Sequence, residues 1–377
     1  MKSSRVGNNR AMRPTSISLL ILLQCLVSPS LVECRVYNIK DYGARTDQDC
    51  TEAIRNTLEA AALDEKNGGA EVLIPKGNFI TAPINITSNI TLRINGHLRA
   101  IKDSSKYPPV ALLPSYGYDL DLGHFSSNSS GHLRHHPFIW SINATNITIC
   151  GSGVIDGSGS YWLEKFHNET LNKVGRPHLM EINGGQDITI RGENTDEGSR
   201  LTLLNSGFWT LHPIYCNNVH IHSINIVASH CNTWGDKCNP NIDGIDVDSS
   251  TNVLIENNHI SVGDDHVTVL SGGGEAGRKF NMPSKNVTVK NNILGTGMGL
   301  SIGSSVSGGI EDVLYYNNTM NETRMQWGLG VHIKTRVGIG GYIKNVVWDS
   351  NTYYNTGSGG EWSAWVVCRG VCRHLTI

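Results

Sequence analysis

Charged side chains are scarce in this sequence. Of 377 residues, 31 are Lys or Arg and 33 are Asp or Glu, so the net charge is −2 at pH 7. Such a balance supplies no basic stripe to neutralise phosphates, so nucleic acid is not an expected partner. Aromatic residues are also few, at 7%, whereas 41 glycines and many asparagines indicate tight turns between short strands.

Long apolar runs are absent beyond one stretch near the start. That stretch, Ile17–Val27, follows the basic residues Lys2, Arg5, Arg10 and Arg13 and is too short to span a bilayer. It predicts a signal peptide over residues 1–34, with the mature chain starting close to Arg35. We therefore expect a secreted, extracellular protein without a membrane span.

Glycosylation sequons and cysteines also bear on whether the protein is secreted. Seven of the nine cysteines lie beyond residue 34, and Cys231 and Cys238 are close enough to close a small loop in an oxidising compartment. Isolated buried thiols are the less favoured interpretation for such a chain. Nine sequons are too many for chance and favour the secretory route: Asn85, Asn89, Asn128, Asn143, Asn146, Asn168, Asn286, Asn317 and Asn321.

A short motif recurs along the chain: Asn or Asp followed by an alternating, β-branched strand. From Asn146 onward its steps are 41, 31, 34, 34, 26 and 33 residues. A constant strand with loops of varying length is typical of a solenoid. The motif begins at Asn89, Asn146, Asp187, Asn218, Asn252, Asn286, Asp312 and Asn345.

These repeats predict an all-β fold, a single-stranded right-handed parallel β-helix, as one domain over residues 35–350. No amphipathic helices separate the strands, which disfavours a βαβ sheet or an α/β barrel. One helix, from Thr51 to about Leu63, is expected to cap the open N-terminal end. Beyond Ser350 the strand motif stops, so residues 351–377 are expected to form an irregular tail, either because the chain is truncated or because its end is atypical.

Several carboxylates fall on neighbouring repeats. Asp243 lies one repeat before the pair Asp264 and Asp265, and residues one coil apart stack at about 4.8 Å. Adjacent residues of a regular strand face opposite ways, so both members of the pair can reach one cleft only at a bend, which Gly263 can supply. Clustered acids suit either hydrolysis of a glycosidic bond or calcium binding. For Asp246 and Asp248, hydrogen bonding within an Asp-rich turn is the better interpretation.

Over residues 36–346 the chain resembles the polygalacturonase-type, or pectinase, glycoside hydrolases, whose fold is a pectin-lyase-like solenoid. The resemblance includes Tyr42-Gly43-Ala44, Ile74–Phe79, Gly151–Gly157, Arg176-Pro177 and Phe208–His212. Its most specific parts are Asn241-Ile242-Asp243-Gly244, Gly263-Asp264-Asp265 and Ser301–Ser304 followed by Ser307–Gly309.

The resemblance implies an inverting hydrolase that acts on galacturonan-like acidic polysaccharide. Asp264 would be the general acid, while Asp243 and Asp265 would activate water across a carboxyl separation of roughly 6.5–9.5 Å. Asn241 would join the substrate-binding residues. No cofactor or metal is expected, because no Cys or carboxylate is spaced to complete a site with the histidines. We expect a monomer.

Two positions depart from the family pattern. Met298 stands where the family usually has the histidine of Gly-His-Gly, and His332-Ile333-Lys334 stands where it has Arg-Ile-Lys. His332 and Lys334 project from one face at i and i+2, and the resemblance implies that they hold the substrate carboxylate. An imidazole replaces a permanently charged guanidinium there.

Three function classes follow. The favoured one is a glycoside hydrolase of pectin-type polysaccharide. The second is a carbohydrate-binding relative that has lost turnover, because of Met298 and His332. The third is a polysaccharide lyase, which would need calcium and a basic proton acceptor, for which Lys334 is the one evident candidate.

Overall fold

The computed structural model describes residues 35–64, 69–116, 133–168, 170–171, 174–228, 241–321, 330–335 and 337–354, and the backbone of 371–376. The chain divides into two compact units, residues 1–33 and 34–377, and every described residue belongs to the second. The predicted signal peptide and the Cys231–Cys238 loop therefore lie outside the described residues. No helix among the described residues is long and apolar enough to cross a membrane.

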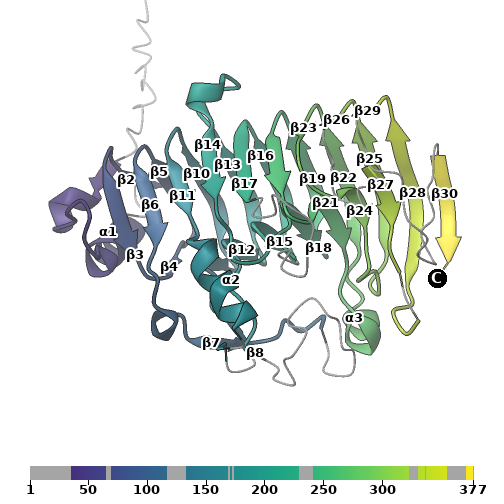
Figure 1. Cartoon of the computed structure of the whole chain (residues 1–377), viewed down its shortest axis with the longest axis horizontal. Helices are drawn as coiled ribbons and strands as arrows, with labels where there is room; N and C mark the ends of the chain where they lie inside the picture. Colours follow the sequence, from purple (N-terminus) through teal and green to yellow (C-terminus); the bar gives the residue numbers. More distant parts are fainter. Residues whose placement is uncertain are drawn as a thin grey trace, which may run out of the picture. The chain divides into compact units, whose positions relative to one another are not determined.

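Three long sheets form the described part of the chain, and within each sheet the strand order follows the sequence (Figure 1). Each turn of chain gives one strand to each sheet, and neighbouring turns pair in parallel, as in β10–β13, β11–β14 and β12–β15. This is the predicted parallel β-helix. Antiparallel pairing occurs between β28 and β30 and between the short strands β7 (Pro109–Ala111) and β8 (Leu133–His135).

The three sheets are named A, B and C below. Sheet A contains β1 (Arg35–Asn38), β2 (Ala70–Ile74), β5 (Ile90–Ile94), β10 (Thr145–Gly151), β13 (Gln186–Arg191), β16 (Asn217–His222), β19 (Thr251–Glu256), β22 (Ser284–Lys290), β25 (Ile310–Tyr316), β28 (Tyr342–Asp349) and β30 (Val371–Thr376). Sheet B contains β3 (Asn78–Thr81), β6 (His97–Ala100), β11 (Val154–Asp156), β14 (Leu201–Leu204), β17 (Ile224–Ala228), β20 (His259–Val262), β23 (Ile293–Leu294), β26 (Thr319–Asn321) and β29 (Thr352–Tyr354). Sheet C contains β4 (Ile84–Asn85), β9 (Ile139–Ile142), β12 (Met180–Asn183), β15 (Leu211–Ile214), β18 (Ile245–Asp248), β21 (Asp265–Leu270), β24 (Gly299–Ile302) and β27 (Gly330–Ile333).

The recurring Asn or Asp has a defined backbone role at sheet A. All eight motif residues adopt the left-handed conformation, with φ between 53° and 60°. Asn and Asp tolerate this region better than β-branched residues do, which explains why the strand motif always starts with them. Asn286 Nδ2 donates to Asn252 Oδ1 at 2.7 Å, so these two residues occupy corresponding corners of successive coils.

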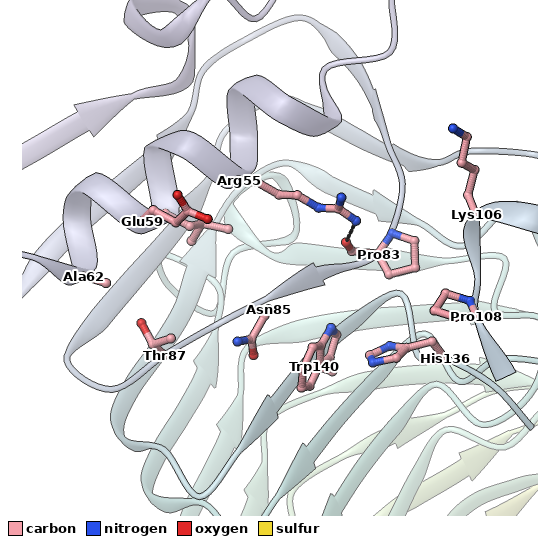
Figure 2. Close-up of a pocket in the computed structure, with 11 residues that line it drawn as sticks. Arg55, Glu59, Ala62, Pro83, Asn85, Thr87, Lys106, Pro108, His136 and Trp140 are labelled. Carbon is pink, nitrogen blue, oxygen red and sulfur yellow. Dashed lines mark hydrogen bonds between the residues drawn. The ribbon is translucent and has the colours of Figure 1, made fainter. Parts of the chain in front are cut away.

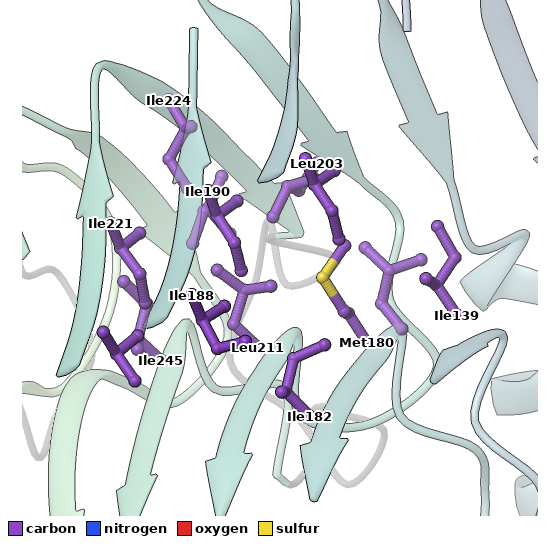
Figure 3. Packing of buried hydrophobic residues seen from close by; sticks show 14 of the residues in the cluster. Ile139, Met180, Ile182, Ile188, Ile190, Leu203, Leu211, Ile221, Ile224 and Ile245 are labelled. Carbon is purple, nitrogen blue, oxygen red and sulfur yellow. The ribbon is translucent and has the colours of Figure 1, made fainter. Parts of the chain in front are cut away.

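Aliphatic side chains fill the space between the sheets. Ile188 and Ile190 of β13 point inward and stack on Val219 and Ile221 of β16. Figure 3 shows these isoleucines meeting Leu203 of sheet B and Met180, Leu211 and Ile245 of sheet C. The period of two along each strand therefore sets one continuous core and leaves alternate residues of every sheet outside.

The N-terminal cap is as predicted. Helix α1 (Thr51–Ala62) buries Ile54, Thr57, Leu58 and Ala61, and packs on β2, β4 and the 3₁₀ turn η1 (Ile39–Tyr42). It covers apolar surface at the start of the solenoid. Two further 3₁₀ turns, η3 (Ser104–Lys106) and η4 (Glu197–Ser199), lie in the connections.

Other features differ from the sequence interpretation. Strand β29 continues sheet B beyond Ser350, and β30 pairs antiparallel with β28, so strands continue into the segment expected to be irregular. Helices α2 (Gly159–His167) and α3 (Gly274–Phe280) interrupt two connections. Cys50, Cys150 and Cys216 are free and buried, contrary to the expectation against isolated thiols.

Candidate active site

The predicted site lies on the outer face of sheet C. Residues at one register position project outward from successive strands and form a line that we call the outer row. Its members are Trp140, Glu181, His212, Asp246, Thr268, Ser301 and His332. Asp243, Asp264 and Asp265 gather near the position of Asp246 in this row.

The structure brings the three predicted aspartates together. One carboxylate oxygen of each lies within 4.8 Å of the others. Asp243 precedes β18, Asp264 sits in the bend between β20 and β21, and Asp265 opens β21, where the pairing with β24 shifts register. The bend and the irregular register let both members of the pair reach one place, as the sequence predicts.

Backbone hydrogen bonds hold this bend. The N–H groups of Gly263 and Asp264 both donate to Ile242 O at 3.1 Å, and Gly244 N donates to Asp265 O at 2.9 Å. The predicted binding residue Asn241 donates its backbone N–H to Asp264 Oδ2 at 3.0 Å. The role of Asn241 seen here is thus to position Asp264.

His332 and Lys334 both contact Asp265. His332 Nε2 lies 3.1 Å from Asp265 Oδ1, and the Lys334 ammonium donates to Asp265 Oδ2. His332 is 2% exposed, whereas the Lys334 side chain is 19% exposed. Burial alone would favour the neutral acid, but Lys334 and then His332 outweigh it and hold the pKa of Asp265 below its usual range. Burial opposes the charge of Lys334 as well, and Asp265 outweighs it and raises the pKa of the ammonium.

The neighbouring acids have pKa values shifted the other way. Burial, followed by the charge of Asp265, raises the pKa of Asp264. Burial and then Asp264 raise the pKa of Asp243 well above its usual range. Two carboxyls next to each other in sequence therefore have pKa values shifted in opposite directions, as an acid and a base that act at one pH require.

Met298 lies on the coil after the aspartate pair. Its backbone N–H donates to Asp264 O at 2.7 Å, and its side chain is half-buried. An imidazole is nonetheless close by, because His266 accepts from Gly299 N through Nδ1 (3.1 Å) and donates to Gly295 O through Nε2 (3.0 Å). A Cβ at Gly297 would lie 2.5 Å from this ring, so only glycine fits there. Burial lowers the pKa of His266 to about 4, so the ring is neutral near pH 7.

Two further residues lie at this site: Arg176, which the sequence did not assign to it, and Asp246, whose interpretation as a hydrogen-bonded turn residue was wrong. Asp246 is fully buried, neither of its oxygens accepts a hydrogen bond from a described residue, and burial followed by the charge of Asp265 raises its pKa well above the usual range. Arg176 is buried between the rings of Phe166 and Phe208, at 4.5 and 5.0 Å, and donates to Gly207 O at 2.9 Å. Burial lowers the pKa of Arg176 to about 10, against the charges of Asp243 and Asp264. The Arg176-Pro177 pair was the only sequence signal for it.

A buried ionic network lies two strands away from Asp246 in the outer row. Arg134 donates to both oxygens of Glu181, at 2.6 and 2.8 Å, and His212 bridges Glu181 and Asp248 at 3.3 and 3.4 Å. His178, Glu181 and His212 could by distance hold a metal ion. Because the Arg134 guanidinium already occupies both Glu181 oxygens, these residues do not suit a cation. Asp248 also accepts from Gly272 N at 3.1 Å and from Ser249 Oγ at 2.9 Å, in keeping with its predicted structural role.

The aspartate cluster is a poor calcium site for a similar reason. The Lys334 ammonium stands at the carboxylate of Asp265, where a divalent ion would have to bind. Calcium prefers a cage of several free oxygen ligands. The arrangement suits proton transfer between carboxyl groups better than metal binding.

Comparison with known proteins identifies the family of the chain. The family model described as "Glycosyl hydrolases family 28" matches residues 66–359, which include all three aspartates. The chain belongs to this family of glycoside hydrolases. The family membership predicted from the aspartate motifs is thereby confirmed.

Individual relatives carry polygalacturonase names. A Vitis vinifera protein named "Probable polygalacturonase" is 34% identical over 326 residues, which is 84% of this chain and 61% of that protein. The chain therefore spans less than two thirds of the length of this relative. An exopolygalacturonase structure from Thermotoga maritima is 25% identical with a TM-score of 0.65, over 86% of this chain and 77% of that one. A family 28 exopolygalacturonase from Yersinia enterocolitica is 23% identical and shares the fold. Its TM-score is 0.68, over 85% of this chain and 59% of that one.

Proposed function

We propose that this protein is a secreted polygalacturonase-like hydrolase that cleaves glycosidic bonds in galacturonan-type acidic polysaccharide. The observation that carries the proposal is the pair Asp264 and Asp265, whose pKa values are shifted in opposite directions within one buried cluster. The names of the relatives support galacturonan as the substrate class.

Each aspartate has a role in this proposal. Asp264, with its raised pKa, carries the proton that is given to the leaving glycosidic oxygen. Asp265 stays ionised because of Lys334 and accepts the proton of the attacking water. Asp243 faces both and orients that water. The C–O bond to the leaving sugar breaks as water adds to the anomeric carbon, and the two carboxyl groups exchange their protonation states.

The stereochemical course of the proposed reaction depends on the separation of the carboxyl groups. Inverting enzymes usually have carboxyl groups about 6.5–9.5 Å apart, and retaining ones about 5–5.5 Å. Here the nearest oxygens of the three carboxylates lie within 4.8 Å of one another, so the distance itself does not support inversion. Inversion rests on the family resemblance, and the anomeric form of the first product, observed by proton NMR, tests it directly.

A product assay with Asp264→Asn as its control tests the function. The parent should release reducing ends from polygalacturonate without ultraviolet-absorbing unsaturated ends. The amide keeps the shape of Asp264 but delivers no proton, so turnover should fall by about 10²–10⁴-fold with an unchanged melting temperature. Full activity in Asp264→Asn would remove this residue from the mechanism.

A binding protein without turnover is the second candidate. His332 is buried against Asp265, which leaves Lys334 as the more accessible cation for a substrate carboxylate. Polysaccharide binding with no released ends at any pH would favour this candidate. The lyase is disfavoured, because the raised pKa of Lys334 keeps its amine protonated and unable to accept a proton.

Secretion is proposed on separate grounds. The leader-like start supports it, as do the sequons in the described residues, whose asparagines are all exposed: Asn85, Asn89, Asn143, Asn146, Asn168, Asn286, Asn317 and Asn321. Recovery of a glycosylated chain from the culture medium of a eukaryotic host would support this route. An unglycosylated chain retained inside the cell would contradict it.

A further inference from the structure

A cavity lies at the N-terminal end of sheet C, away from the aspartates. It has a volume of about 340 Å³ and opens between helix α1, the start of sheet C and the segment around η3. In Figure 2 Arg55 and Glu59 lie on the helix, Asn85 and Trp140 on neighbouring strands and His136 beside Trp140, while Lys106 stands at the rim with its amine directed away from Trp140. Its size falls within the range of small-ligand sites.

The lining combines an aromatic ring with cations. Trp140 is half-buried, and His136 packs edge-on against it with ring centroids 4.4 Å apart, which fixes the indole. Arg55 Nη2 donates to Pro83 O at 2.9 Å and its Nη1 lies 3.5 Å from Glu52 Oε1, so a ligand carboxylate would share Arg55 with Glu52, whereas Lys106 is exposed. A flat aromatic face suits the C–H groups of a sugar ring, and cations suit a uronate carboxylate. Glu59 is the one acid among the lining residues.

This cavity is separated from the aspartate cluster. Trp140 and Asp246 belong to the same outer row but stand three strands apart, which is about 14 Å at the usual strand spacing. Between them Glu181 and His212 are 4% and 1% exposed, and Arg134 covers Glu181. A disaccharide at the aspartates therefore cannot reach Trp140, whereas a long chain can contact both places.

We propose that this cavity is a second carbohydrate-binding site that takes a uronate residue of the acidic polysaccharide. Trp140 stacks on the sugar ring, and Lys106 and Arg55 pair with its carboxylate. The inference rests on the proposed function for its ligand class. The site would hold the polymer near the aspartates without contributing to the chemical step.

The sequon at Asn85 constrains the experiment. Asn85 lines the cavity, and a glycan attached to it would fill the same space, so the proposed site is open only in a chain that carries no glycan at Asn85. The protein is therefore produced in a bacterial host that attaches no N-glycan. Turnover is blocked during binding measurements with the Asp264→Asn variant as background.

Three variants in that background test the site by titration with polygalacturonate at low salt. Lys106→Glu and Trp140→Ala should each weaken polymer binding by about 3–10-fold. Glu59→Gln removes a repelling carboxylate and should tighten binding by about twofold. Lys102→Glu makes the same charge reversal on the same segment at an exposed residue outside the cavity lining, and it should bind like the parent.

Kinetics with short and long substrates complete the test. In the otherwise intact enzyme, Lys106→Glu should raise KM for polygalacturonate and leave kcat/KM for digalacturonate unchanged. Binding that is equal in Lys106→Glu, Lys102→Glu and the parent would overturn the inference. So would equal binding of a neutral galactan. If the parent hydrolyses nothing but the binding pattern appears, the proposed activity fails and the second site stands.

Discussion

Single residues at the site act through their immediate neighbours. Asp264 and Asp265 are adjacent and both buried, yet only Asp265 faces an ammonium group and an imidazole. Asp264 instead accepts two backbone N–H groups, from Asn241 and Asp265, at 3.0 Å each. In the proposed reaction Asp265 is the base and Asp264 the acid. They differ because His332 of β27 and Lys334, which follows this strand, both contact Asp265.

The substitution Lys334→Met tests this electrostatic assignment. Without the ammonium the pKa of Asp265 should rise, so Asp265 becomes protonated at a higher pH than in the parent. The acid-side limb of the kcat profile should therefore move to higher pH. Lys344→Met, which removes an exposed lysine near Glu311, should leave the profile unchanged. An acid limb that stays in place would show that Asp265 is not the ionised base.

The residues of the site were predictable to different degrees. The convergence of Asp243, Asp264 and Asp265 follows from their repeat positions and from the bend at Gly263. The contact of His332 with Asp265 depends on how a buried imidazole is packed, which the alternation of a strand does not determine. Asp246 was misassigned because its spacing resembles that of a hydrogen-bonded turn, although its oxygens receive no such bond from the described residues.

Individual strands are joined by ladders of asparagine side chains. One ladder lies where the chain passes from sheet A to sheet B, and it consists of Asn258, Asn292, Asn318 and Asn351. Each of the first three donates its Nδ2 to Oδ1 of the next at 2.9–3.0 Å. Asn258, Asn292 and Asn318 are buried. Each amide also donates to a carbonyl of the preceding coil, so the ladder satisfies backbone groups at the turn.

The substitution Asn292→Ala should destabilise the fold strongly. It leaves the Asn258 amide and the Ile255 carbonyl without their partners, and buried unsatisfied groups cost about 1–3 kcal/mol each. We expect a loss of about 2–4 kcal/mol in the free energy of unfolding, measured with urea. Asn225→Ala, at a half-buried asparagine with one long hydrogen bond, should cost under about 1 kcal/mol. If both variants lost a similar free energy of unfolding, the ladder would stabilise the fold no more than a half-buried asparagine outside it does.

Elements with a repeated signal were predicted well, and isolated ones were not. The Asn-led strands of sheet A and the helix from Thr51 follow from periodicity and from the left-handed residue at each strand start. Helices α2 and α3 have nine and seven residues and lie in connections of irregular length, so no period marks them. Strand β29 consists of exposed residues, which removes the alternation that reveals other strands.

The molecule as a whole is stabilised mainly between neighbouring coils. Each strand of a sheet pairs only with the strands before and after it, so stability is close to a sum of adjacent contacts. Coils in the middle have two neighbours, whereas the last coil has fewer. Within the described part of the chain, strand β29 pairs with β26 alone, and its residues are exposed.

Hydrogen exchange should follow this order along the solenoid. Amides of β16 and β19, which are paired on both sides, should be protected nearly to the level of global unfolding. Amides of β29 should exchange faster by several orders of magnitude. Mass spectrometry of peptides from a labelling time course measures both. Uniform protection from β16 to β29 would indicate a single cooperative unit instead.

The spread of the aspartates and their lysine over successive coils limits how the gene can change. Asp243 precedes β18, the acidic pair opens β21, and Lys334 follows β27, so the reacting groups depend on four adjacent strands of sheet C. Duplication of the β24 coil would move Lys334 one strand spacing away from Asp265, and a coil inserted between β18 and β21 would likewise move Asp243 away from the acidic pair. Deletion of the β24 coil would shift Lys334 by one strand spacing toward Asp265 and also break the present contact. A coil gained or lost before β18 would lengthen or shorten the protein and leave these groups in register. Relatives can therefore differ in the number of coils before β18, whereas the number of coils between β18 and β27 has to stay the same for the site to form.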